Sequence, residues 1–220
     1  SVIHDLRNPL NSIMGFVQLA QQASRGHKDE KLDNTLNKAI DAGWNLNRMI
    51  DEILEFARGY SPQLNTSPTD LEFFVEMALK PHKKKLAALD ISLKCSTDKG
   101  KGIQVAFDSD QMYRVMDNLL NNARECFFSG SHDVMEKRIN VNIIEEDEHA
   151  VLKVFDNGPG IPDQIKDSLF EPFTTIGKKS GTGLGLAIVR NIVTAHSGTI
   201  SLEAHGPEGG ALFELKFPKI

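Results

Sequence analysis

The chain has 220 residues, 40% of them hydrophobic and 25% charged, which is an ordinary composition for a soluble globular protein with one large or two small domains. Its formal net charge is -5 and its longest basic run is Lys83 to Lys85, so nucleic acid is not expected as a partner. No run of about 18 apolar residues occurs, so no membrane contact by this fragment is expected. The two cysteines lack metal-ligand spacing and fit a reduced, cytoplasmic setting.

Apolar residues at alternating steps of three and four predict two helices, over residues 1–24 and about 30–59. The first seam consists of Ile3, Leu6, Leu10, Ile13, Val17 and Ala20, and the second of Leu32, Leu36, Ala39, Gly43, Leu46, Ile50, Ile53 and Ala57. A helical hairpin cannot bury both apolar faces alone, so we expect residues 1–60 to form a homodimer as a four-helix bundle. In the alternative, the second domain covers this face. Because the seam already runs at Ile3, we expect an excised core, with any membrane anchor in a missing N-terminal region.

His4 lies one position after a seam residue, so its imidazole flanks the apolar stripe. Asp5 follows it at once, and Asn8 lies one turn further along the same face. An exposed histidine beside an acid is often only a surface residue. A neutral imidazole is also a good nucleophile near neutral pH, and an adjacent carboxylate can accept its proton. The rest of the sequence favours the nucleophile.

Residues 61–68 contain two prolines and small polar residues, which predicts an extended linker to a second domain over residues 69–220. The predicted helices of this domain cover residues 69–89, with Phe73 and Phe74 inside, then 108–128 and 183–197. The predicted strands cover residues 91–95, 103–107, 138–144, 150–155, 199–204 and 212–217, with a long loop at 157–182. We therefore expect an α+β protein whose second domain is an α/β sandwich, a mixed sheet covered on one face by helices.

Three features of the second domain suit a nucleotide. Asn118 and Asn122 are four apart on one helix face, and their amide oxygens can complete the shell of a phosphate-bound Mg²⁺. Asp156 ends a buried strand, where a carboxylate can accept from the exocyclic amine of adenine; Gly158 and Gly160 then let the backbone turn sharply. The segment from Gly181 to Leu186 opens a helix, where backbone N–H groups favour phosphates. Each feature alone is a weak or moderate signal, but their order on these elements is a strong one.

Together these residues resemble a known family. The segment from His4 to Asn11 resembles the phospho-acceptor box of the two-component sensor histidine kinases. The second domain resembles the ATP-binding module that these kinases share with type II topoisomerase ATPase subunits, ninety-kilodalton heat-shock chaperones and mismatch-repair ATPases. The matching motifs are residues 118–122 (N-box), 156–160 and 181–185 (glycine boxes) and 170–173 (F-box). The resemblance spans nearly the whole chain.

The resemblance implies a function: ATP phosphorylates His4, and the phosphoryl group then passes to an aspartate of a response-regulator receiver domain. It implies ATP and Mg²⁺ as cofactors, with Asp156 on adenine and with Asn122 and Asn118 on the metal. The nucleotide-binding residues it implies are Asn118, Asn122, Asp156, Gly158, Gly160, Gly181, Thr182, Gly183, Leu184 and Gly185, together with Lys178 and Lys179 of a lid over residues 161–180. It also implies that Asp5 orients the His4 proton and that Asn8 holds a water for a reverse phosphatase reaction.

Three positions bear on the alternatives. The ATPases of this fold place a glutamate at the position of Asn118 to activate water, and an amide cannot act as that base, so transfer is favoured over hydrolysis. Glu125 stands where many of these kinases have a basic residue, and Ala211 and Leu212 stand where the family usually has a hydroxyl near adenine. These departures keep open a non-catalytic module that binds nucleotide or a receiver domain, and a GHKL-type ATPase is the second alternative.

Overall fold

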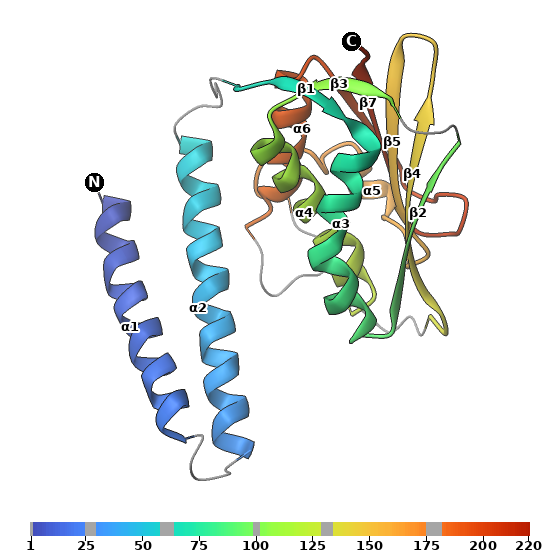
Figure 1. Ribbon diagram of the computed structural model, residues 1–220. Helices are drawn as coiled ribbons and strands as arrows, with labels where there is room; N and C mark the ends of the chain where they lie inside the picture. Colours follow the sequence, from blue (N-terminus) through green and yellow to red (C-terminus); the bar gives the residue numbers. More distant parts are fainter. Residues whose placement is uncertain (1, 25–29, 58–63, 99–101, 129–133, 175–181) are drawn as a thin grey trace. The chain divides into compact units, whose positions relative to one another are not determined.

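The computed structural model describes residues 2–24, 30–57, 64–98, 102–128, 134–174 and 182–220, and within the first two helices it leaves several side chains undescribed, those of residues 2–9 among them. The chain forms two compact units, Ser1–Tyr60 and Ser61–Ile220. The first unit is helical and the second contains the sheet (Figure 1). In the described part of the chain, no helix combines the length and apolar character needed to cross a membrane.

The first unit is a pair of helices, α1 (Val2–Ser24) and α2 (Glu30–Ala57), that run antiparallel. Asn47 Nδ2 donates to Asn11 Oδ1 at 3.1 Å, and Gln21 Nε2 donates to Asn37 Oδ1 at 2.7 Å. Residue numbers rise along α1 while those of their partners fall along α2, which shows that the two helices are antiparallel. Met14 is buried against Gly43, where an added Cβ would lie 2.6 Å from the Met14 Cγ.

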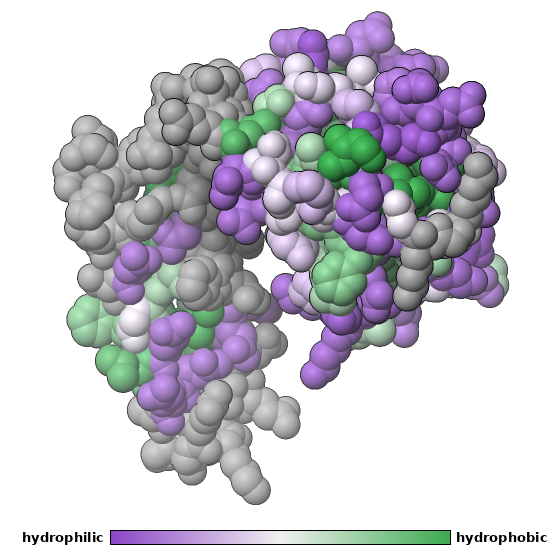
Figure 2. All heavy atoms as spheres, turned by 45° about the horizontal axis from the view of Figure 1, so that its top comes forward, coloured by the Kyte–Doolittle hydropathy of each residue, from purple (hydrophilic) through white to green (hydrophobic). Residues whose placement is uncertain are grey.

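Part of the surface of this hairpin is apolar, and Figure 2 shows hydrophobic residues of this unit at the surface beside hydrophilic ones. Ile13, Phe16 and Leu19 of α1 are 59%, 71% and 61% exposed. Ile13 was predicted at the seam, whereas its neighbour Met14 makes the contact within the hairpin. The seam therefore serves only in part to join α1 to α2, and the predicted homodimer remains a prediction.

The second unit contains a five-stranded mixed sheet in the order β2-β4-β5-β7-β6. Its strands are β2 (Ile91–Thr97), β4 (Lys137–Glu145), β5 (His149–Asp156), β6 (Thr199–Glu203) and β7 (Leu212–Pro218). Only β2 and β4 are parallel; the other neighbours are antiparallel. A separate antiparallel pair joins β1 (Ser67–Asp70) to β3 (Gln104–Phe107). This is the expected mixed-sheet, α+β architecture.

Three helices cover one face of the sheet: α3 (Leu71–Ala87), α4 (Ser109–Cys126) and α6 (Gly185–Ala195) (Figure 1). Side chains alternate along a strand, so residues opposite one another in the ladder share a face. Val154 lies opposite both Val141 and Phe213, and all three are buried under the helices. The α3 and α4 helices begin where the sequence predicts, because Asp70 Oδ1 accepts from the Phe73 N–H and Asp108 Oδ1 from the Gln111 N–H.

The structure differs from the sequence-based expectation at three places. Strand β1 was not predicted, and its first two residues, Ser67 and Pro68, fall in the expected linker; Pro68 is tolerated because β1 pairs on one side only. A short helix, α5 (Asp163–Lys166), lies within the predicted long loop. Phe73 is 61% exposed rather than inside, because Phe74 faces the core and the next residue on a helix points about 100° away.

Candidate functional site

The candidate site centres on Asp156, the last residue of β5. It lies opposite Ile139 on the face of the sheet that the helices cover, and it is only 4% exposed. Its Oδ1 accepts from the Gly158 N–H at 2.8 Å and from the Cys126 thiol at 3.5 Å. An ionised carboxylate offers about four acceptor positions, so a ligand donor can still be accommodated.

Burial raises the pKa of Asp156 above its ordinary value. The hydrogen bonds from Gly158, from the Cys126 thiol and from the backbone of Ala211 lower the pKa and offset part of this effect. A buried carboxylate is costly to the folded protein, and groups with a pKa shifted in this way cluster at functional sites.

The loop between β6 and β7 forms one wall beside Asp156. A Cβ at Gly210 would collide with Asp156 Oδ1 and with the Asp156 carbonyl oxygen, so only glycine fits there. The Asp156 N–H donates to the Ala211 carbonyl at 3.2 Å. Ala211 and Leu212, which replace the hydroxyl expected near adenine, are both buried.

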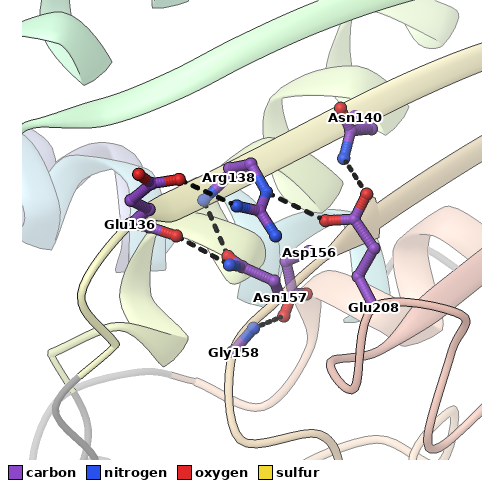
Figure 3. Close-up of polar contacts among 7 residues, drawn as sticks. All are labelled: Glu136, Arg138, Asn140, Asp156, Asn157, Gly158 and Glu208. Atoms are coloured by element: carbon purple, nitrogen blue, oxygen red, sulfur yellow. Dashed lines mark hydrogen bonds and ion pairs between the residues drawn. The ribbon is translucent and has the colours of Figure 1, made fainter.

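Asn157 fastens the turn after β5 to the start of β4 (Figure 3). Its Oδ1 accepts from the Arg138 N–H at 2.7 Å, its Nδ2 donates to the Glu136 carbonyl at 2.7 Å, and its own N–H donates to the Arg138 carbonyl at 3.2 Å. The turn that carries Gly158 and Gly160 is therefore held from its first residue.

A second cluster joins α4 to the start of α6. Asn118 Nδ2 donates to the Arg114 carbonyl at 3.0 Å, and a Cβ at Gly185 would lie 2.9 Å from Asn118 Oδ1. The amide oxygen therefore faces the first residue of α6. Amide oxygens are ligands of the kind Mg²⁺ accepts, so Asn118, with Asn122 one turn on, fits a metal that a phosphate also holds.

The approach to α6 depends on a close backbone contact. Gly183 has φ +69°, and a Cβ there would lie 2.5 Å from the Phe173 carbonyl carbon. Phe173 is itself in the left-handed region, with φ 67°. Thr182 Oγ1 accepts from the Leu184 N–H at 3.2 Å, while the Leu184 side chain is fully buried. The side chain of Leu184 thus belongs to the core, and its carbonyl accepts from the Ile188 N–H at 2.9 Å in the first turn of α6.

Helix α4 connects the two clusters, because Asn118 and Asn122 precede Cys126 at steps of four along one face. The predicted residues that the structure brings to this region are Asn118, Asn122, Asp156, Gly158, Gly160, Thr182, Gly183, Leu184 and Gly185. Lys178, Lys179 and Gly181 lie outside the described residues. His4, Asp5 and Asn8 lie on α1, but their side chains are not described.

Sequence reasoning missed Cys126, Asn157 and Gly210. The step of four that singled out Asn118 and Asn122 leads to Cys126, so the signal for that residue was present. Asn157 stood inside the glycine-rich turn and was passed over. Gly210 carried no local signal, because its role comes from the approach of a distant loop to Asp156.

Comparison with known families and proteins gives matches over both units. Residues 107–220 match the family model for histidine kinase-, DNA gyrase B- and HSP90-like ATPases, and residues 1–61 match the His Kinase A phospho-acceptor domain. The chain is 33% identical to sporulation kinase A of Bacillus subtilis over 99% of its own length and 34% of that protein. It is 32% identical to the sensor histidine kinase ZraS of Escherichia coli K12, over 99% of this chain and 44% of that one.

Solved structures share the fold. The full-length ShkA structure with AMPPNP superposes with a TM-score of 0.77 at 21% identity, covering 99% of this chain and 44% of that chain. The histidine kinase ThkA, in its complex with the response regulator TrrA, gives a TM-score of 0.69 at 25% identity and covers 100% of this chain and 60% of that chain. The chain thus spans less than half the length of each of the two curated relatives named above.

Proposed function

This chain belongs to the two-component sensor histidine kinases, and on that premise we propose that ATP bound by the second unit phosphorylates His4 of the first, after which the phosphoryl group passes to an aspartate of a response regulator. One observation carries the proposal. The buried carboxylate of Asp156, next to Cys126, and the amide oxygen of Asn118, next to Gly185 at the start of α6, lie toward opposite ends of one face of α4. This spacing suits a ligand with adenine at one end and a phosphate chain at the other.

The site would bind ATP at its adenine end and at its phosphate end. Asp156 accepts from the adenine amine, and the turn through Gly158 and Gly160 lies beside the ring. The phosphates meet the backbone amides from Gly181 to Gly185 at the start of α6, where the helix dipole favours negative charge. Lys178 and Lys179 neutralise further phosphate charge. Because ATP is a cytoplasmic substrate, we assign this unit to the cytoplasm.

Asn122 and Asn118 would hold Mg²⁺ through their amide oxygens, together with phosphate oxygens. The bound ion supplies charge neutralisation on the phosphates. The Asn118 geometry fits this role, because the Nδ2 donates to Arg114 and only the oxygen faces Gly185.

The reaction is an in-line phosphoryl transfer. A ring nitrogen of His4 forms a bond to the γ-phosphorus while the bond to the bridging oxygen breaks, and ADP leaves. Asp5 accepts or orients the imidazole proton. Transfer is favoured over hydrolysis because Asn118 cannot deprotonate water. Asn8, one turn from His4, holds the water of a reverse phosphatase reaction.

The first unit also provides a dimer. Ile13, Phe16 and Leu19 form an exposed apolar face that a second copy of the hairpin would cover in a four-helix bundle. The response regulator would dock on the same unit, near His4. The structure of ThkA with the response regulator TrrA supports a partner of this class.

Counting products separates this function from its two alternatives. We incubate the chain with ATP and Mg²⁺ and measure ADP and phosphoprotein over time. Transfer predicts one ADP for each phosphorylated chain, followed by a plateau. Continued ADP release without phosphoprotein would indicate an ATPase, and nucleotide binding without either product would indicate a non-catalytic module.

A further inference from the structure

The loop between β6 and β7, residues 204–211, reaches a strand that is not its neighbour. In the sheet order β2-β4-β5-β7-β6, strand β4 is separated from both strands of this hairpin by β5. Glu208 nevertheless contacts β4 twice: its Oε2 accepts from Arg138 Nε at 3.1 Å, and its Oε1 accepts from Asn140 Nδ2 at 3.2 Å (Figure 3). Arg138 and Asn140 are two apart on a strand and so share a face.

The same loop forms the wall beside Asp156. Gly210 packs so closely that no Cβ fits, and the Ala211 carbonyl accepts from the Asp156 N–H at 3.2 Å. The loop contains three glycines, at 206, 209 and 210, and such a segment has wide backbone freedom when nothing anchors it. Backbone bonds from the Gly206 N–H to the Gly210 carbonyl and from the Gly209 N–H to the Gly206 carbonyl close the loop on itself, and the Ala211 carbonyl ties its end to β5. Glu208, two residues from Gly210, adds the side-chain contacts that anchor the loop to β4.

Arg138 also braces the opposite side of Asp156. Its backbone N–H and carbonyl bind Asn157, the residue after Asp156, and its side chain binds Glu208 of the loop. Arg138 therefore contacts the segments that lie on both sides of the Asp156 carboxylate. The guanidinium of Arg138 also meets Glu136 at 3.1 Å, but that glutamate is 82% exposed and its pair contributes little. The side chains of Arg138 and Glu208 are only 37% and 32% exposed, and Glu208 also accepts a second hydrogen bond, from Asn140.

We propose that Glu208 is a positioning residue for nucleotide recognition. Without touching the ligand, it fixes the Gly210–Ala211 wall against Asp156 and thereby sets the base end of the site. This inference rests on the proposed function, in which Asp156 accepts from the adenine amine.

The test measures binding at the two ends of the nucleotide separately, using the full chain. ADP affinity in Mg²⁺ reports on both ends, and competition by inorganic pyrophosphate reports on the phosphate end alone. The variants are Glu208→Ala, which removes both contacts, and Glu208→Gln, which keeps the reach and one acceptor. Glu203→Gln is the matched control, an exposed acid on β6 just before the same loop.

We expect Glu208→Ala to weaken ADP binding about three- to tenfold, because the two lost contacts act on the adenine end only through the loop. Glu208→Gln should give a smaller loss and Glu203→Gln none. Pyrophosphate competition should not change, and in autophosphorylation KM for ATP should rise while kcat at saturating ATP stays constant. The loss for Glu208→Gln should shrink in high salt, because salt screens the attraction between the partly exposed charges of Arg138 and Glu208.

Two results would overturn the inference. ADP affinity that is unchanged in Glu208→Ala would show that the loop holds its place without this anchor. A parallel loss of ADP and pyrophosphate binding would show a general structural defect instead. If the wild type binds no adenine nucleotide, the proposed function fails and this inference falls with it, so the two failures are distinguishable.

Discussion

Replacing Asp156 with asparagine tests the base end of the site with almost no change in shape. The amide oxygen can keep the bond from the Gly158 N–H, now 2.8 Å from Oδ1. The NH₂ group then takes the place of the other oxygen and presents a donor to the adenine amine, which is itself a donor. The charge-assisted hydrogen bond is lost and one group is left unpaired in a buried place.

The expected cost is about 2 to 3 kcal/mol, because a hydrogen bond to a charged group contributes about 1.5–3 kcal/mol and an unpaired buried donor adds to the loss. This corresponds to a rise in Kd for ADP of about 30- to 150-fold. The assay is calorimetric or fluorescence titration with ADP and Mg²⁺, with pyrophosphate competition as the measure of the phosphate end. Asp147→Asn, an exposed position in the β4–β5 turn, is the matched control.

The prediction for Asp156→Asn can fail clearly. Pyrophosphate binding should be unaffected, because the phosphates are assigned to the start of α6. A loss in ADP affinity of less than about threefold would mean that Asp156 makes no direct contact with the base. An equal loss for pyrophosphate would mean that the substitution disturbs the whole unit.

Three further predictions concern pH, stability and assembly. Because burial raises the pKa of Asp156, ADP affinity should begin to fall on acidification above the ordinary pH range of a carboxyl group. Between the unfolded and the raised folded pKa the folded protein holds the extra proton, so its stability falls as pH rises there; the Tm of Asp156→Asn minus that of the wild type should therefore increase with pH. His196→Ala should lower the free energy of unfolding of the second unit by about 1 to 3 kcal/mol in a urea titration. The reason is that His196 Nε2 accepts from the Asp108 N–H at 3.0 Å and its Nδ1 lies 2.8 Å from the Ile192 carbonyl. His205→Ala, at an exposed position, is the control, and an equal effect of both variants would refute this reasoning. Phe16→Glu should convert the dimer to a monomer in sedimentation experiments while Gln18→Glu leaves it intact, and a wild type that is already monomeric at high concentration would contradict the proposed bundle.

The helices and strands were largely predictable because their signals are local. Asp70 and Asp108 cap α3 and α4 as expected, since a cap depends only on the next three residues. Strand β1 was missed because Ser67 and Pro68 have low strand propensity and are extended only through their pairing with β3. Phe73 was predicted to be buried because both aromatic residues of the pair Phe73–Phe74 are typical of a core. On a helix, adjacent residues point in different directions, so Phe74 is buried and Phe73 is exposed.

The candidate site was predictable where its residues lie in short motifs. Asp156 with Gly158, and Asn118 with Asn122, are close in sequence. Gly210 is more than 50 residues from Asp156 and packs against it only because β7 lies next to β5 in the sheet. Glu208, in the same loop, reaches Arg138 and Asn140 of β4. No local pattern records that neighbourhood, and only the resemblance placed the adjoining Ala211 and Leu212 near the same ligand as Asp156.

The most direct test of the central claim is incubation with γ-labelled ATP and Mg²⁺, comparing the wild type with His4→Ala and with His149→Ala, a control on the edge of the β4–β5 turn. The account predicts an acid-labile, alkali-stable label in the wild type and in His149→Ala, and none in His4→Ala. A label that persists in His4→Ala, or that survives acid, would contradict phosphorylation of His4.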